Sequence, residues 1–139
     1  MTDQDAIRRV LHDCHTWAVV GLRTPTRPAY RVAAFLQARG KRIVPVHPAG
    51  GEVLGERCYP ALADIPFPVD CVDVFRRSDC AGDVADEAIA VGARAVWFQL
   101  GVIDEAAAAR VRAAGIEMVM DHCPAIEWAA YGPTGVASG

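Results

Sequence analysis

Short apolar runs alternate with helical patterns along most of this chain, and this alternation limits its fold more than any other feature. We expect strands at five of the runs: residues 17–22, 42–46, 71–75, 95–100 and 117–121. Apolar runs of this length without polar alternation are typical of parallel strands buried on both faces. Because βαβ crossovers are right-handed in about 98% of cases, the pattern predicts a doubly wound parallel α/β sheet with helices on both faces.

The helical patterns fall between and around these strands. They cover residues 3–14, 29–39, 81–91, 104–114 and 124–131. Gly40, Gly92 and Gly115 follow three of them in the position of a helix C-cap, and Pro124 opens the last. Helix, glycine and strand thus recur in a fixed sequence, which is typical of βαβ units.

Residues 48–69 differ from the other connections because glycine and proline are frequent there. The segment predicts a loop-rich crossover near the carboxyl ends of the strands, with at most one helical turn at residues 62–64. No other segment resembles a linker. We therefore expect one domain over residues 1–139, with its core at about 16–131 and a flexible tail at 132–139.

Composition excludes several classes of function. No apolar run approaches the roughly 20 residues that a membrane helix needs. The start of the chain is acidic and lacks the apolar core of a signal peptide, which favours a cytoplasmic location. A formal net charge of −3 opposes a broad nucleic-acid surface, so neither a nucleic acid nor a membrane is expected as a partner.

The sequence offers no strong catalytic or metal-binding pattern. The five cysteines are odd in number and have no CxxC spacing, so we expect reduced thiols and no zinc site. His12–His15 and Asp121–Cys123 bring metal-capable residues together, but sequential neighbours seldom converge on one ion or form a triad. We expect no catalytic residues and no metal ligands, and we expect Cys123 to pack or to line a ligand site after the last strand.

The connection after the first strand has the composition of an anion site. The apolar run ends near Gly21, and a polar loop leads into a helix with Arg27 and Arg31 in its first turn. Free N–H groups and the positive dipole end of a helix N-terminus attract anions. The loop therefore predicts a phosphorylated ligand, the alternative being that Gly21 only permits a turn and that the arginines are solvated.

Other polar residues follow the later strands, where α/β sheets bind ligands. Pro48 offers an apolar surface for an adenine with His47 beside it, or the two residues only turn the chain. Phe75, Arg76 and Arg77 suit phosphate or ribose contacts, or they belong to an exposed loop before a helix at Ser78 or Asp79. Gln99 and Gly101 suit a thin ligand arm, although neighbouring main chain would also satisfy Gln99.

A nicotinamide dinucleotide fits these residues poorly. Such a site normally has the spacing GxGxxG after the first strand and an acidic residue at the end of the second. Here Gly21 stands without the later glycines, and His47 and Pro48 follow the second strand. Both absences count against NAD.

Six segments together carry a family resemblance that spans residues 17–131. They are GLRTPTRPAYRV (21–32), IVPVHP (43–48), EVLGERCYPALADIP (52–66), VDCVDVFRR (69–77), AVWFQLG (95–101) and VMDHC (119–123). In this order they resemble the small single-domain CoA-binding proteins, whose Rossmann-like domain is similar to the N-terminal domain of the succinyl-CoA synthetase alpha subunit. With this resemblance we expect a Rossmann-like five-stranded sheet whose strands, numbered in chain order, lie in the order 3-2-1-4-5. The ligase activity of that enzyme needs a second domain and a partner subunit, so it is not implied.

The resemblance implies coenzyme A or acyl-CoA as the ligand, and it assigns residues to each part of it. The phosphate-binding loop would contain Gly21, Leu22, Arg27, Pro28, Ala29, Tyr30 and Arg31. His47 and Pro48 would flank the adenosine, and Phe75 and Arg76 would line the neighbouring wall. Gln99, Leu100 and Gly101 would lie along the pantetheine arm.

This chain departs from the family pattern at several positions. Ala49 and Ala125 stand where the family has lysine, His122 where it has arginine, and Ala29 where it often has serine. Fewer cations imply weaker CoA binding unless other arginines substitute, the candidates being Arg23, Arg27, Arg31 and Arg77.

Non-enzymatic binding of CoA or acyl-CoA is the function that these observations favour. Two alternatives stay open at this point: a CoA-dependent or nicotinamide-dependent enzyme, and an interaction module with a vestigial nucleotide pocket. The last strands, rich in valine and tryptophan, also admit a homodimer.

Overall fold

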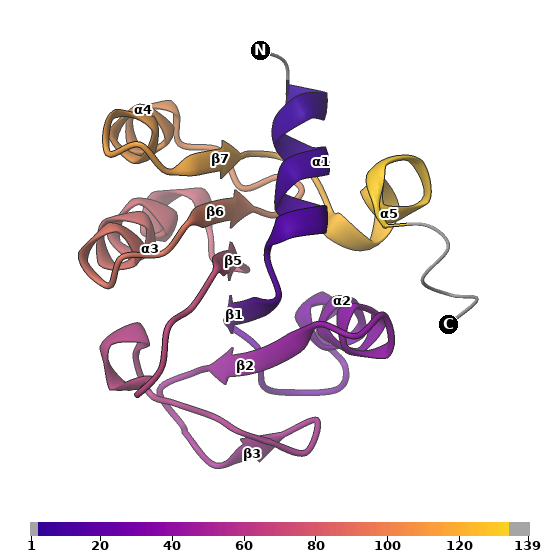
Figure 1. Cartoon of the computed structure of the whole chain (residues 1–139). Coiled ribbons are helices and arrows are strands. Elements are labelled where there is room, and N and C mark those ends of the chain that lie inside the picture. The colour runs from indigo at the N-terminus through magenta and orange to yellow at the C-terminus, as the bar shows by residue number, and fades with distance from the viewer. Residues whose placement is uncertain (1–2, 134–139) are drawn as a thin grey trace.

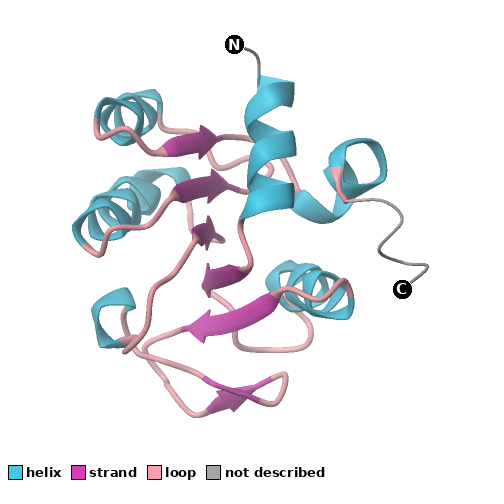
Figure 2. Cartoon of the chain, in the orientation of Figure 1, coloured by secondary structure: helices cyan, strands magenta, loops and turns pink. Residues whose placement is uncertain are grey.

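A five-stranded parallel sheet forms the centre of the computed structural model, which describes residues 3–133 (Figure 1 and Figure 2). Its strands lie in the order β2-β1-β5-β6-β7. Their bounds are Arg42–Val46 (β2), Thr16–Val20 (β1), Cys71–Val74 (β5), Ala95–Phe98 (β6) and Glu117–Val119 (β7). All four pairings are parallel. The predicted α/β fold class is confirmed.

Five helices cover the two faces of this sheet. They are α1 (Asp3–Asp13), α2 (Pro28–Ala38), α3 (Ser78–Ala90), α4 (Glu105–Ala113) and α5 (Pro124–Tyr131). Figure 1 shows α3 and α4 on one face and α1, α2 and α5 on the other. The five predicted helices all form, with ends within about three residues of expectation, because apolar periodicity marks their buried faces.

The predicted strand order is wrong. Numbered along the chain, the five long strands lie in the order 2-1-3-4-5, with β5 next to β1 rather than outside β2. The Asp70 carboxylate, just before β5, accepts hydrogen bonds from the N–H groups of His15, just before β1, and of Thr16, the first residue of β1. These contacts join the two strands at their start. The crossover pattern itself carries no signal for which strand becomes the neighbour.

The crossover from β2 to β5 is mostly loop, as predicted, and its one helical turn forms at Leu62–Asp64 (η1). It also contains a hairpin that the sequence did not reveal, made of β3 (Glu52–Val53) and β4 (Glu56–Arg57). Two-residue strands are too short to show a period. Leu54 and Gly55 form the turn with φ of 54° and 75°, values that suit a tight hairpin.

Each face of the sheet has its own apolar core. Trp17 and Trp97 lie on the face of α1, α2 and α5, are fully buried and stand with ring centroids 5.7 Å apart. Their indole N–H groups donate to the carbonyls of Cys14 and His122, at 2.9 and 2.8 Å. Neither indole nitrogen is therefore left unpaired in the core. The two hydrogen bonds tie β1 to the segment before it and β6 to the loop after β7.

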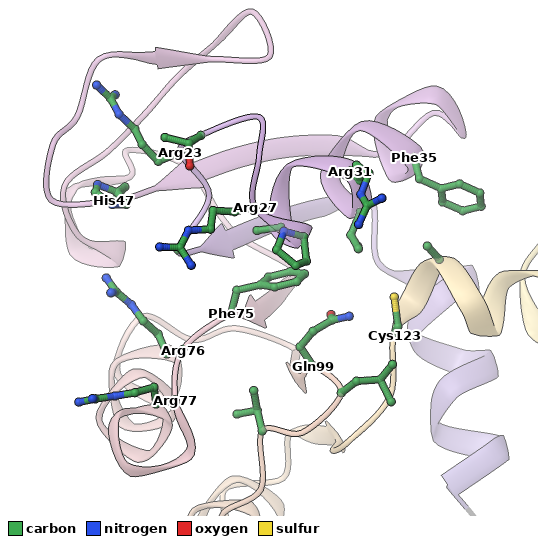
Figure 3. A pocket seen from close by; sticks show the side chains of 18 of the residues that line it. Arg23, Arg27, Arg31, Phe35, His47, Phe75, Arg76, Arg77, Gln99 and Cys123 are labelled. Carbon is green, nitrogen blue, oxygen red and sulfur yellow. The ribbon is translucent and has the colours of Figure 1, made fainter.

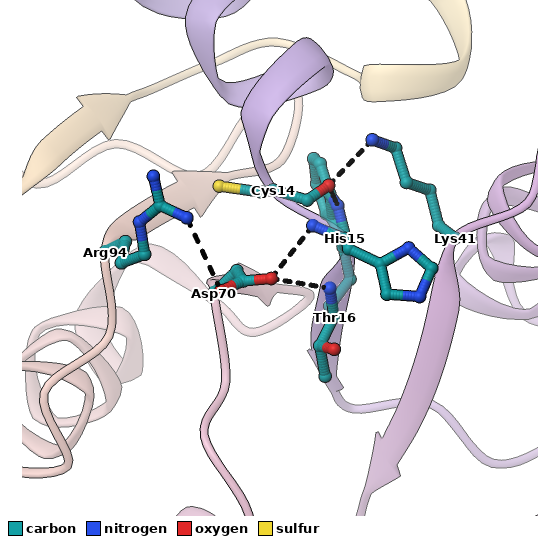
Figure 4. A network of polar contacts seen from close by, with 7 residues as sticks. Cys14, His15, Thr16, Lys41, Asp70 and Arg94 are labelled. Atoms are coloured by element: carbon teal, nitrogen blue, oxygen red, sulfur yellow. Dashed lines mark hydrogen bonds and ion pairs between the residues drawn. The ribbon is translucent and has the colours of Figure 1, made fainter.

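Charged side chains at the amino ends of the strands find partners inside the protein (Figure 4). Besides its two backbone contacts, Asp70 lies 3.8 Å from the Arg94 guanidinium. The Lys41 ammonium donates to the carbonyls of Leu11 and Cys14, at 2.6 and 2.7 Å. Burial lowers the pKa of Lys41. We call this set of contacts the amino-edge network.

The ends of the chain add little to this description. The expected flexible tail lies outside the described residues except for Gly132 and Pro133, and the Gly132 N–H donates to the carbonyl of Trp128. Within residues 3–133, no helix is both long and apolar enough to cross a membrane.

Candidate functional site

An open cavity of about 1210 Å³ lies at the carboxyl ends of the strands (Figure 3). Small-molecule sites usually measure about 300–1,000 Å³, so this cavity suits a large or extended ligand. It includes the ends of β1 and β5, where the strand order changes direction, and this is where open α/β sheets bind ligands.

Gly21 makes the close approach of β1 and β5 feasible. A Cβ at this position would lie 2.5 Å from the carbonyl oxygen of Phe75, and the φ of Gly21 is 100°. Both the contact and the backbone angle exclude other residues. The loop that follows β1 is thereby held against the loop that follows β5.

The N-terminus of α2 faces the cavity without an internal cap. Arg27 is the N-cap residue with extended backbone, Pro28 opens the helix, and no side chain within residues 3–133 caps the first turn. Arg27, Pro28, Ala29 and Arg31 all line the cavity. Uncapped N–H groups and the helix dipole favour an anion here.

Arginines gather at one end of the cavity. Arg23, Arg27 and Arg76 line it, and none of them forms an ion pair within residues 3–133. The Arg23 guanidinium donates to the carbonyl of Gly50, which fixes it beside the turn after β2. Burial and then the positive charges of Arg76 and Arg23 lower the pKa of His47, so these cations lie close to its ring.

His47 and Pro48 do form a turn, as one of the two interpretations held. The Gly50 N–H donates to the His47 carbonyl at 3.0 Å, and the Ala49 N–H donates to Nδ1 of His47 at 3.1 Å. His47 nevertheless lines the cavity, whereas Pro48 is exposed and does not. The turn and the site therefore share the same residue.

The two arginines after β5 differ in position. Phe75 and Arg76 are half-buried and line the cavity. Arg77 is the N-cap residue of α3, its side chain is 80% exposed, and it lies 3.3 Å from the Asp79 carboxylate. Arg77 lines the outer rim, where Figure 3 shows it beside Arg76. The helix-capping interpretation holds for Arg77 only.

Gln99 is the most unusual polar group of the cavity. It is 8% exposed, and its Oε1 has no hydrogen-bond partner within residues 3–133. The interpretation that neighbouring main chain satisfies this atom is therefore wrong. A buried acceptor without a donor costs about 1–3 kcal/mol, which a ligand N–H group would recover.

Four of the fourteen expected binding residues do not line the cavity. The Leu22 side chain is fully buried in the core, and Tyr30 packs partly against that core. Pro48 and Gly101 are exposed. The Gly101 N–H donates to the Asp121 carboxylate at 2.7 Å, which joins the loops after β6 and β7.

The apolar end of the cavity includes three residues that sequence reasoning missed, Val32, Phe35 and Ile126. It is formed by α2 and α5 and by the loops before α4 and α5, and its residues are Val32, Phe35, Val102, Cys123, Ala125 and Ile126. The helical period of α2 places Ala29, Val32 and Phe35 on one face, which was the available signal. The approach of α5 to α2 is a tertiary feature without a local pattern.

The cysteines form no disulfides within residues 3–133, and the metal-capable side chains there are not grouped into a site. All five cysteines are free thiols, as expected. In the part of the chain that the structure describes, no three His, Cys, Asp or Glu side chains are grouped to hold a metal ion. His122 and Asp121 turn to different partners, Glu127 at 3.6 Å and the Gly101 N–H.

Together these features define a Rossmann-like α/β domain with an arginine-rich cavity at its topological switch point. A family model described as a CoA binding domain matches residues 15–129. The chain therefore belongs to this family of CoA-binding domains, and the match supports CoA binding in general.

Several known proteins are similar to this chain. Protein YneT of Bacillus subtilis (strain 168) is 36% identical over 118 residues, which are 84% of this chain and 87% of YneT. A solved structure of a Pyrococcus horikoshii OT3 protein is 34% identical with a TM-score of 0.87 and covers 94% of this chain and 92% of that one.

A larger enzyme shares the fold alone. The apo structure of the dinucleotide-forming acetyl-coenzyme A synthetase 1 of Ca. Korarchaeum cryptofilum has a TM-score of 0.71 at 22% identity. The match covers 91% of this chain but 31% of the synthetase chain. The same architecture therefore also occurs as one part of a longer protein.

Proposed function

We propose that this protein binds coenzyme A or acyl-CoA without catalysing a reaction, with the phosphates at the arginine end of the cavity. The observation that carries this proposal is the polarity of the cavity. Arg23, Arg27 and Arg76 lie at one end without ion-pair partners within residues 3–133, and Figure 3 shows the Gln99 amide and the Cys123 sulfur toward the other. CoA has the same polarity, since its charged nucleotide continues into a long neutral arm.

The arginine end suits the phosphates of the nucleotide. Arg27 and Arg76 lack carboxylate partners within residues 3–133, and the uncapped start of α2 lies beside them. Arginine binds phosphate in a bidentate, charge-assisted manner. His47, whose pKa is lowered by burial and then by the neighbouring cations, would contact the adenosine. Arg23 supplies a positive charge in place of the lysine that the family resemblance implies at position 49, where this chain has alanine.

The other end suits the pantetheine arm. Its two amide groups can donate to an acceptor, and the buried Oε1 of Gln99 needs a donor. Val32, Phe35 and Val102 supply apolar walls for the methylene groups. A thin arm lying over Gln99 would therefore remove the unpaired acceptor and bury apolar surface in one step.

The lining offers little support for an enzyme. No carboxylate lines the cavity among the described residues, so His47 has no acidic partner there to form an acid–base pair. Arginines can stabilise a charge but do not exchange protons at neutral pH. This composition favours binding over turnover.

Titration calorimetry with a series of ligands tests the proposal. We expect CoA to bind, and pantetheine to bind at least about a hundredfold more weakly, because each lost charge-assisted hydrogen bond removes about 1.5–3 kcal/mol. NADH should not compete. Equal affinity for CoA and pantetheine would contradict the phosphate assignment, and consumption of acyl-CoA by the pure protein would contradict the non-enzymatic role.

A further inference from the structure

Cys123 lies where the far end of a bound CoA arm would arrive. It follows β7, is the N-cap residue of α5 and lines the cavity on the side away from Arg23, Arg27 and Arg76. Figure 3 shows its sulfur pointing into the space between α2 and α5. The residue is 6% exposed, so access to this thiol runs through the cavity.

Gln99 independently indicates that a ligand occupies this end. It is more than nine-tenths buried, lines the same cavity and holds an acceptor oxygen without a donor inside residues 3–133. A ligand that satisfies Gln99 places an amide near the floor of the cavity. In CoA the terminal thiol follows the second amide by two methylene groups, which directs that sulfur toward the neighbouring Cys123.

The remaining cysteines do not share this position. Cys14, Cys58 and Cys71 are buried and do not line the cavity. Burial raises the pKa of all three thiols, that of Cys14 to about 12. Cys80 is partly exposed, but it lies on α3 outside the cavity, 3.7 Å from the Arg77 guanidinium. A ligand held by the arginines would reach Cys123 alone.

We propose that Cys123 is a modification site that takes up CoA covalently by exchange with a CoA disulfide, which is the oxidant of the step. This inference rests on the proposed function. The Cys123 thiol gives up its proton, and its sulfur attacks one sulfur of the CoA disulfide. The disulfide bond of the reagent breaks, a bond between Cys123 and one CoA forms, and the second CoA leaves as a thiolate that takes up the proton. Cys123 is oxidised, and the leaving CoA sulfur is reduced by the same electron pair.

This reaction would give the protein two ligand states. Reduced CoA or acyl-CoA binds reversibly, whereas CoA disulfide leaves one CoA attached until another thiol reduces the bond. The covalent state keeps the cavity filled and shields Cys123 from other oxidants, because the sulfur is reached only through that cavity.

The test is the intact mass of the pure protein after incubation with CoA disulfide, followed by peptide mapping without reductant. We expect one added CoA on Cys123, removed by dithiothreitol. Glutathione disulfide at the same concentration should react at no more than about one tenth of the rate with CoA disulfide, because it lacks the nucleotide that raises the effective concentration at the sulfur. Cys80→Ser should leave the adduct unchanged, and Cys123→Ser should abolish it.

Three results would overturn the inference: no CoA on Cys123, an adduct mapped to Cys80, or equal rates with CoA disulfide and glutathione disulfide. Calorimetry with reduced CoA on the same preparation separates this inference from the proposed function. Binding of reduced CoA without an adduct removes the inference and keeps the function, whereas failure of both removes the function as well. Because the site is mapped on the unsubstituted protein, the result does not depend on how Cys123→Ser folds.

Discussion

Charged side chains lie at both ends of the parallel strands, but they have different partners at the two ends. We call the side of the sheet where the strands begin the amino edge and the side where they end the carboxyl edge. At the amino edge, Asp70 accepts two backbone N–H groups and lies beside Arg94, and Lys41 binds two carbonyls. At the carboxyl edge, Arg27 and Arg76 have no ion-pair partner within residues 3–133. The charged groups of the amino edge stabilise the fold, whereas the arginines of the carboxyl edge are available to bind a ligand.

The comparison extends to neutral polar groups. Among the helices that begin at the carboxyl ends of the strands, α2 lines the cavity and has no side-chain cap within residues 3–133, and the Gln99 oxygen in the same cavity has no donor there. A small domain does not gain stability from such gaps. Because both features lie in the lining of the cavity, they indicate that this end of the sheet is built for binding, and substitutions should separate the two roles.

The largest effect is expected at the amino edge. Asp70→Ala leaves the N–H groups of His15 and Thr16 without their acceptor and should lower the free energy of unfolding by about 2–4 kcal/mol. Urea denaturation measures this change. Asp83→Ala, at an exposed position on α3, should stay within about 0.5 kcal/mol. If Asp70→Ala instead weakened CoA binding and left stability unchanged, the two edges would not have separate roles.

Asp73 lies in the middle of β5, between the two edges, and is the next largest case. It is fully buried, and both carboxylate oxygens lack partners within residues 3–133. Burial raises its pKa well above the ordinary value of 3.8. The folded state then holds this proton more tightly than the unfolded state, so stability is present below that value and is lost as pH rises toward the folded pKa.

Asp73→Asn should remove this loss. The free energy of unfolding of the variant, relative to the parent protein, should rise with pH above about 4, with a limiting slope of about 1.4 kcal/mol per pH unit. Urea denaturation between pH 4 and 8 provides the measurement. A difference independent of pH would show that Asp73 keeps its ordinary pKa.

Substitutions at the carboxyl edge should affect CoA binding more than stability, the reverse of what we expect at the amino edge. Arg27→Ala and Arg76→Ala should each weaken CoA binding about tenfold, the loss of about 1.4 kcal/mol, with little change in stability. Calorimetry with CoA gives the affinity, and urea denaturation gives the stability. The control is Arg112→Ala, an exposed cation on α4. If Arg112→Ala weakened CoA binding equally, the loss of affinity would reflect the net charge of the protein and not a contact in the cavity.

The smallest expected effect is a gain. Ala29 is buried at the start of α2 and lines the cavity, at a position where the family resemblance implies a serine. Ala29→Ser should strengthen CoA binding by about 0.5–1 kcal/mol through one added hydrogen bond to a phosphate. Ala34→Ser, on the same helix but outside the cavity lining, is the control for changes in helix stability. An unchanged affinity of Ala29→Ser would place the phosphates elsewhere.

Much of the fold could be predicted because its signals are local. Apolar runs marked the five long strands, and glycines marked three helix ends: Gly40, Gly92 and Gly115 follow α2, α3 and α4. The strand order could not be predicted, because it depends on contacts such as Asp70 with His15 that join distant residues. The β3–β4 hairpin was too short to show a period.

The site was predictable in the same uneven way. Residues directly after strands, such as Gly21, His47 and Gln99, were found because parallel strands deliver them to one edge. The apolar wall of Phe35 and Ile126 was not found, since it forms when α5 packs near α2. Asp73 carried a visible signal, an acid between two valines in a buried run, that the strand assignment passed over.

An NMR titration of the ¹⁵N-labelled protein with CoA tests the separation of the two edges most directly. The account predicts that the amide signals of Gly21, Arg76 and Gln99 shift, whereas those of Thr16 and Arg94 do not. An absence of shifts at saturating CoA, or shifts concentrated around the amino-edge network, would contradict it.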